Sequence, residues 1–134
     1  MATIKSFTDL SQSKKLAEIL PLESADCFWD YDEMQKFHRI SWFEDGYNKE
    51  SQLMLNENNI CAWSLAALLE AIPQEIFDGE YILNITEGCD NRWALTYDHF
   101  ENRNHSYFGL SICADNLIDA FYKLILKLHE RKML

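Results

Sequence analysis

Apolar positions recur at helical spacing in two blocks of the chain, residues 10–20 and residues 62–72. Each block is followed directly by a proline, Pro21 in the first case and Pro73 in the second. Proline disfavours helical backbone in the residue before it and removes a hydrogen-bond donor, so both blocks are predicted to end there. The second block is apolar on almost every side, which predicts a helix that is buried around most of its circumference.

A third helix is predicted from Asp115 or Asn116 to Lys132, with Ser111 or Asp115 as the N-terminal cap. Its apolar stripe is formed by Leu117, Phe121, Leu124, Ile125 and Leu128. Apolar side chains cover more of its circumference than contact with one sheet requires, which leaves room for a homodimer.

Shorter segments carry the signals of strands. Residues 27–31 and 37–43 are rich in aromatic and β-branched side chains, and residues 81–86, 92–97 and 107–113 alternate between apolar and polar positions. The last three segments predict an antiparallel meander. The resulting order α-β-β-α-β-β-β-α predicts an α+β fold, with an antiparallel sheet of about 3–5 strands and three helices packed on one face.

The length and composition predict one globular domain that covers residues 1–134. The chain has 134 residues, the usual size of a domain, and hydrophobic residues make up 48% of it, which excludes a disordered protein. The segment 1–7 has no apolar run long enough for a signal peptide, and no segment is long and apolar enough to span a membrane.

The net charge is −10, and it is concentrated in the middle of the chain. Residues 21–101 hold 17 acidic and four basic side chains, a net charge of −13, whereas both end segments are slightly basic. Proteins bind nucleic acid mostly by neutralising phosphates with Lys and Arg, so direct binding to nucleic acid is not expected. An acidic region of this kind suits either solubility or a basic partner surface.

The cysteines at positions 27, 61, 89 and 113 are scattered and contain no CxxC pair, which argues against a zinc knuckle or a thioredoxin-type site. Their apolar neighbours predict buried, unpaired thiols. Together with the missing signal peptide, these cysteines predict a protein of the reducing cytoplasm.

No motif marks catalysis, a metal or a cofactor. His99 and His105 flank one polar connection, and His99 with Cys89 or Cys113 forms a conceivable nucleophile pair, but no ligand or catalytic spacing supports either interpretation. The carboxylates between positions 26 and 33 match no calcium loop. The glycines are isolated, so no glycine-rich phosphate loop is present. We therefore expect no cofactor, and a non-enzymatic protein is the preferred interpretation.

Aromatic residues among acids form the most suggestive group in the sequence. Trp63 and Trp93 lie inside periodic segments and are predicted to belong to the core. Side chains near the first two strand segments are instead predicted to form a surface for a partner or ligand, because aromatic side chains anchor many interfaces. These candidate residues are Trp29, Asp30, Tyr31, Asp32, Trp42 and Glu44.

Three stretches, KLAEILPLESA at 15–25, CAWSLAALLE at 61–70 and ADNLIDAFYKLILKLHE at 114–130, resemble a group of small uncharacterised proteins carried by phages and mobile elements of Bacteroidetes. The group has no established activity, so no functional residue is transferred. The resemblance implies a cytoplasmic accessory protein of a mobile element that acts on host or competing machinery.

Three functions follow as hypotheses. The preferred one is an accessory protein that binds another protein. The alternatives are a protein that binds or sequesters a nucleotide or metabolite in an aromatic pocket, and an acidic mimic of nucleic acid that inhibits a DNA-handling protein.

Overall fold

The computed structural model describes residues 5–88 and 90–134, which group into two compact units. The N-terminal unit is Ser6–Ala71, and the C-terminal unit is Ile72–Leu134 together with Lys5. Helices and antiparallel sheets are both present, which confirms the predicted α+β class. The strands form two sheets, one in each unit. That residues 1–134 form one domain stays a prediction.

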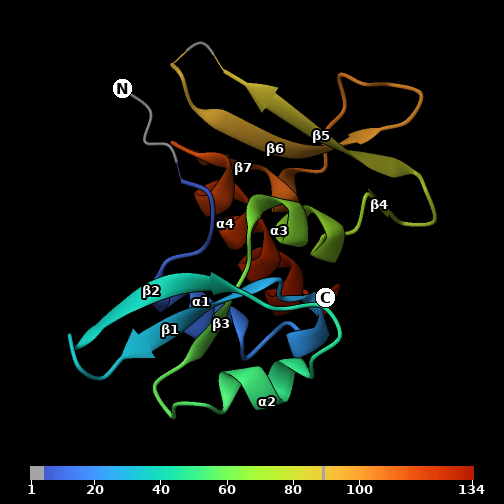
Figure 1. Cartoon of the computed structure of the whole chain (residues 1–134). Helices are drawn as coiled ribbons and strands as arrows, with labels where there is room; N and C mark the ends of the chain where they lie inside the picture. Colours follow the sequence, from blue (N-terminus) through green and yellow to red (C-terminus); the bar gives the residue numbers. More distant parts are fainter. Residues whose placement is uncertain (1–4, 89) are drawn as a thin grey trace. The chain divides into compact units, whose positions relative to one another are not determined.

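The N-terminal unit contains a three-stranded antiparallel sheet in the order β2-β1-β3 (Figure 1). Its elements are α1 (Leu10–Leu16), the 3₁₀ helix η1 (Leu22–Ser24), β1 (Cys27–Asp32), β2 (Phe37–Trp42), α2 (Lys49–Leu53), β3 (Ile60–Ala62) and α3 (Leu65–Ala71). The central strand β1 pairs with β2 along its full length, from Cys27 opposite Trp42 to Asp32 opposite Phe37. It pairs with β3 at its first three residues. Helix α1 packs against β3.

The C-terminal unit contains a four-stranded antiparallel sheet in the order β4-β5-β6-β7 (Figure 1). Its elements are β4 (Glu75–Ile76), β5 (Tyr81–Glu87), β6 (Trp93–His99), the 3₁₀ helix η2 (Phe108–Leu110), β7 (Ile112–Ala114) and α4 (Leu117–Glu130). The predicted meander is therefore confirmed as β5-β6-β7. Helix α4 packs against β6 and β7 and buries most of its apolar stripe.

Large side chains that are almost fully excluded from solvent form the interior. In the N-terminal unit they are Leu16, Trp63 and Leu68, and in the C-terminal unit they include Tyr97, Phe121, Leu124, Ile125 and Leu128. The prediction that Trp63 belongs to the core is confirmed, whereas Trp93 is only half-buried.

The first two helices are shorter than the sequence predicts. Residues 17–20 continue α1 as a tighter turn, in which Ile19 N donates to Leu16 O at 2.9 Å. The second predicted helix begins too early, because Ile60–Ala62 forms β3 and only Leu65–Ala71 is helical. A short apolar run fits a buried strand as well as a helix, so the hydrophobic pattern alone cannot separate them.

Other differences concern short elements. Helix α2 and strand β4 have only five and two residues, too few for a periodic pattern to develop. Residues 107–113 form η2 and then β7 in place of one strand. The cap of α4 is Asn116, whose side chain accepts the Asp119 N–H, and neither Ser111 nor Asp115 has this role. Within the described residues, no helix has the length and apolar character needed to cross a membrane.

Candidate functional site

The six residues predicted to form a partner surface all lie in or beside the β1–β2 hairpin, but the sheet separates them. Successive side chains of a strand point to opposite faces. Trp29 and Tyr31 therefore share one face with Trp42, while Asp30 and Asp32 lie on the other. Glu44 follows the end of β2 and is exposed. The aromatic and acidic parts of the predicted surface thus do not form a single patch.

Two of the six side chains have structural roles. The Trp29 indole N–H donates to Thr8 O at 3.0 Å, and its ring meets the Phe7 ring edge-on with centroids 5.6 Å apart. Asp32 Oδ1 accepts the backbone N–H groups of Met34 at 2.9 Å and Gln35 at 3.1 Å. The carboxylate of Asp32 therefore organises the hairpin turn, as Asp does in many tight turns.

The tip of the N-terminal unit carries apolar side chains that are almost fully exposed. We call this the tip surface; it comprises Met34 in the hairpin turn, Met54 and Leu55 after α2, and the neighbouring acids Glu33 and Glu57. Met34 is 94% exposed, Met54 73% and Leu55 84%. Exposed apolar side chains on neighbouring loops are a common feature of interaction sites.

Hydrogen bonds join the two loops of the tip surface to each other and to the sheet. Asn56 Nδ2 donates to Glu33 Oε1 at 2.9 Å, which brings together the immediate neighbours of Leu55 and Met34. Tyr31 N donates to Asn59 Oδ1 at 2.8 Å, and a ring nitrogen of His38 lies 3.0 Å from Asn58 O. The exposed apolar side chains therefore stand on loops with defined positions.

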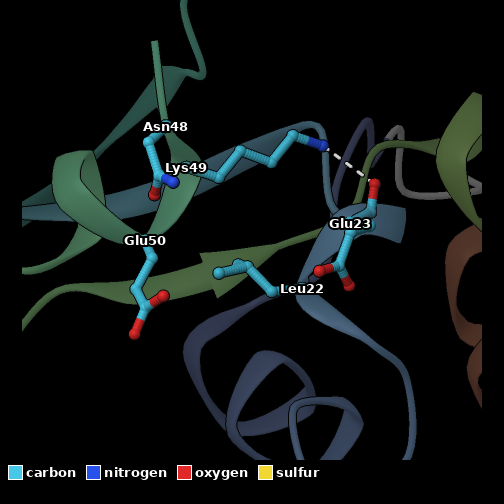
Figure 2. A pocket seen from close by; sticks show the side chains of 5 residues that line it. All are labelled: Leu22, Glu23, Asn48, Lys49 and Glu50. Atoms are coloured by element: carbon cyan, nitrogen blue, oxygen red, sulfur yellow. Dashed lines mark hydrogen bonds between the residues drawn. The ribbon is translucent and has the colours of Figure 1, made fainter.

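A second candidate is the groove around Lys49, which lies between η1 and α2 in the same unit. Figure 2 shows Leu22 and Glu23 facing Asn48, Lys49 and Glu50 across a pocket of about 250 Å³. Two adjoining pockets, of about 420 Å³ and 310 Å³, also have Lys49 and Asp26 among their lining residues.

The Lys49 ammonium group already forms hydrogen bonds with backbone carbonyl groups of its own chain. Lys49 Nζ donates to the carbonyl oxygen of Glu23 at 2.9 Å (Figure 2). It also donates to the carbonyl oxygen of Ala25 at 2.5 Å and lies 5.5 Å from the centroid of the Phe43 ring. An ammonium group with these partners joins α2 to the segment before β1. This geometry supports a structural role for Lys49.

The C-terminal unit has an aromatic groove of about 320 Å³, lined by Glu80, Tyr81, His99, Asn102 and His105. The structure brings together the two histidines that flank the polar connection in the sequence: their ring centroids lie 6.5 Å apart, and His99 N donates to His105 O at 2.8 Å. His99 Nε2 lies 3.8 Å from Glu80 Oε1. The groove thus offers imidazole, phenol, amide and carboxylate groups to a small ligand.

The orientation of the His99 ring is defined by its own loop. His99 Nδ1 accepts the backbone N–H groups of Glu101 at 3.2 Å and Asn102 at 3.3 Å. This arrangement favours the tautomer with its proton on Nε2, which is the nitrogen that faces Glu80.

The sequence left open a pair of His99 with Cys89 or Cys113, and the described residues do not assemble the pair with Cys113. Cys113 is opposite Ala94 in the β6–β7 pairing, and His99 lies five residues further along β6, about 17 Å away at the usual rise of a strand. Cys89 lies outside the described residues. The expectation that Cys113 is buried is wrong, because β7 exposes it while burying its neighbours Ile112 and Ala114.

Cys27 and Cys61 are buried, as predicted, and their thiols are held in the neutral form. Burial, followed by the negative charge of Asp26, raises the pKa of Cys27 to about 12. Burial also raises the pKa of Cys61. Since the thiolate is the nucleophilic form, neither residue is suited to covalent catalysis near neutral pH.

Among the residues that the structure describes, no group of three or more His, Cys, Asp and Glu side chains is placed to hold a metal ion. No family model matches the chain, and no curated protein or solved structure matches it either. The candidate sites therefore rest on their geometry alone.

The sequence interpretation missed the tip surface. Met34 stands between Glu33 and Gln35, and Met54 and Leu55 follow Leu53 in a run of three apolar residues before Asn56, outside every periodic apolar segment. Apolar residues next to turn residues were the available signal, but only the fold brings the two loops together.

Proposed function

We propose that the chain is a non-enzymatic accessory protein that binds a basic protein partner through the tip surface. The observation that carries the proposal is the exposure of Met34, Met54 and Leu55 on loops joined by hydrogen bonds. When a partner covers exposed apolar surface of this kind, the free energy of the system falls by about 25 cal/mol for each Å² removed from water.

The side chains of the tip surface indicate what kind of partner surface would bind there. Methionine is flexible and polarizable, so it adapts to partner surfaces of irregular shape. Glu33 and Glu57 stand beside the apolar side chains, and the region between residues 21 and 101 has a net charge of −13. The complementary partner has an apolar patch surrounded by Lys or Arg, and its association should weaken as salt concentration rises.

The first test compares partner capture by matched variants. The variant Met34→Ser/Met54→Ser/Leu55→Ser removes the apolar part of the tip surface at positions that contribute little to the core. The control is Phe108→Ser, which replaces another large apolar side chain, 87% exposed, in the C-terminal unit. The wild type and both variants are immobilised and exposed to lysate of the native host.

The expected result is a basic protein that the wild type and the Phe108 variant retain and that the triple variant loses. Elution with salt should release this protein from the wild type. The purified partner should then bind the wild type more tightly than the triple variant. Equal capture by all three proteins, with circular dichroism showing that each is folded, would contradict the use of the tip surface.

The aromatic groove of the C-terminal unit supports a second candidate function, the binding of a small nucleotide or metabolite. A ring-bearing ligand can stack on Tyr81 and form hydrogen bonds with His99 and Asn102. A thermal-shift screen tests this function, because a ligand at a hundredfold excess over its Kd stabilises a protein by about 2.7 kcal/mol. Tyr81→Ala should abolish the shift, whereas the triple tip variant should retain it.

The cellular context of the proposal comes from the resemblance to small proteins of Bacteroidetes mobile elements. It suggests an accessory protein that acts on host or competing machinery in the cytoplasm. The unpaired thiols of Cys27, Cys61 and Cys113 suit such a reducing compartment.

A further inference from the structure

Strand β2 is a long and open sheet edge. Of the strands that end the two sheets in the described residues, β2 has six residues, whereas β3 and β7 have three each and β4 has two. Residues just beyond β3 are covered, since Thr8 N donates to Trp63 O at 2.9 Å and Phe7 forms a bridge with Ser64. The sequence of β2, FHRISW, contains no proline or glycine, and Arg39 is its one residue with a permanent charge.

The alternation of hydrogen bonds shows which backbone groups β2 directs outward. The β1–β2 register continues to Asp26 and Phe43, where Phe43 N donates to Asp26 O at 3.2 Å. Hydrogen-bonded and non-hydrogen-bonded pairs alternate along an antiparallel ladder. The N–H and C=O groups of His38, Ile40 and Trp42 therefore point away from β1.

We propose that β2 pairs with β2 of a second copy of this chain, antiparallel and about a two-fold axis at Ile40. In this register Ile40 is opposite the partner's Ile40, and His38 is opposite the partner's Trp42. Each outward backbone group then meets a complementary group of the partner. The result is a continuous six-stranded sheet built from two three-stranded ones, with the isologous contact typical of dimers.

The side chains of β2 select this register over its neighbours. Moving the axis to Arg39 would place the two Arg39 side chains opposite each other, and like charges in that position are unfavourable. Moving it to Ser41 would leave His38 without a partner residue in β2. With the axis at Ile40, the outward-facing residues His38, Ile40 and Trp42 all pair with residues of the partner's β2. Trp42, which is 56% exposed, then lies beside the imidazole of the partner's His38.

Charge complementarity favours the same arrangement. Arg39 is exposed and forms no ion pair within the part of the chain that the structure describes. At the proposed register it is opposite the partner's Ser41. Within each chain Asp30 is opposite Arg39, and its Oδ2 accepts the Ser41 hydroxyl at 3.4 Å, so the proposed interface would bring two Asp30 carboxylates and two Arg39 guanidinium groups onto one face of the joined sheet. This arrangement offsets part of the repulsion between two acidic chains.

The test combines sedimentation with site-directed cross-linking of the full chain. Ile40→Cys and Trp42→Cys are each introduced into a Cys89→Ser/Cys113→Ser background and treated with a mild oxidant that forms disulfides. Residues at position 40 would be about 5.5 Å apart between their Cα atoms, whereas residues at position 42 would be about 14 Å apart. We expect Ile40→Cys to form covalent dimer at least about tenfold faster than Trp42→Cys, because only the first pair lies within cross-linking reach.

Sedimentation equilibrium of the wild type should show a dimer that Arg39→Glu weakens. Circular dichroism verifies that every variant is folded. A wild type that remains monomeric at several hundred micromolar overturns the proposal. So does a dimer in which the two cysteine variants cross-link at the same rate, because that dimer would use a different face.

Discussion

The carboxylate of Asp26 accepts hydrogen bonds from both the backbone N–H and the hydroxyl of Ser64, although 38 positions separate them in the sequence. Asp26 immediately precedes β1, and Ser64 immediately precedes α3. The Ser64 hydroxyl oxygen in turn accepts the Ala67 N–H at 3.3 Å, so the same side chain caps the helix. One carboxylate thus links the start of the central strand to the start of a helix.

We predict that Asp26→Ala lowers the free energy of unfolding by about 1–3 kcal/mol, since it leaves buried donors without their charged acceptor. Ser64→Ala should cost a similar amount through the lost cap. Urea denaturation of both single variants and the double variant gives the coupling energy. Strictly additive effects would show that the two side chains do not stabilise the fold as a pair.

Trp29 and Trp42 should respond differently to substitution, although both belong to the surface that the sequence predicts. Trp29→Ala removes the hydrogen bond to Thr8 and the contact with Phe7, so it should destabilise the protein by about 3 kcal/mol or more. Trp42→Ala should change stability by less than about 0.5 kcal/mol, because Trp42 is mostly exposed. Thermal denaturation of the monomer at low concentration measures both, and equal losses would contradict the assigned roles.

These tryptophans illustrate how far the sequence predicts the site. The aromatic and β-branched residues at 27–31 and 37–43 located the two strands correctly. Strand geometry also implies that the neighbours Trp29 and Asp30 lie on opposite faces, which the predicted single surface did not take into account. The sequence could not show that Thr8, 21 positions earlier, accepts the Trp29 indole N–H. Long-range partners of this kind depend on the complete fold.

The fold itself was predictable where the hydrophobic pattern is long. Helix α4 has 14 residues and one consistent apolar stripe, and its position was predicted to within two residues. Strand β3 was not predicted, because three residues are too few to show a pattern, and its last residue, Ala62, was assigned to the start of the second helix. Cys61 is held in a strand by its pairing with Phe28 of β1, a residue far away in the sequence, so no pattern of neighbouring residues can reveal the strand.

The Lys49 ammonium group should stabilise the N-terminal unit through its two carbonyl partners. Lys49→Met preserves the length of the aliphatic chain but removes the donors, so the free energy of unfolding should fall by about 1–3 kcal/mol. Lys14→Met is a suitable control, because Lys14 is an exposed lysine of α1. The two variants are compared by chemical denaturation. A loss in the control as large as that in Lys49→Met would refute the structural role of the Lys49 contacts.

Because the thiol of Cys27 is buried, the free energy of unfolding should fall as the pH becomes alkaline. The pKa of this thiol is raised from 9.0 to about 12 in the folded state, so between these values the unfolded chain loses a proton that the folded chain retains. The stabilising effect is complete below pH 9 and is lost as pH rises toward 12. One such group contributes a slope of about −1.4 kcal/mol per pH unit.

Urea denaturation under reducing conditions between pH 8 and 11 measures this slope. Cys27→Ala should show a shallower decline than the wild type, whereas Cys113→Ala, which changes an exposed thiol, should not. Identical slopes in all three proteins would argue against retention of the Cys27 proton.

The hairpin turn under the tip surface contains a strained residue whose replacement should stabilise the fold. Lys36 has φ of 57°, in the left-handed region, and its N–H donates to Asp32 O at 2.7 Å. A residue other than glycine pays about 1–2 kcal/mol for this conformation. Lys36→Gly removes that strain but adds flexibility to the unfolded chain, so we expect the free energy of unfolding to rise by about 0.5–1 kcal/mol.

Lys36→Val should instead destabilise the protein, because a β-branched side chain tolerates positive φ poorly. Thermal denaturation of the two variants tests both directions. If the turn is fixed as described, Lys36→Gly should also preserve partner binding, since Met34 remains held by the Asp32 carboxylate.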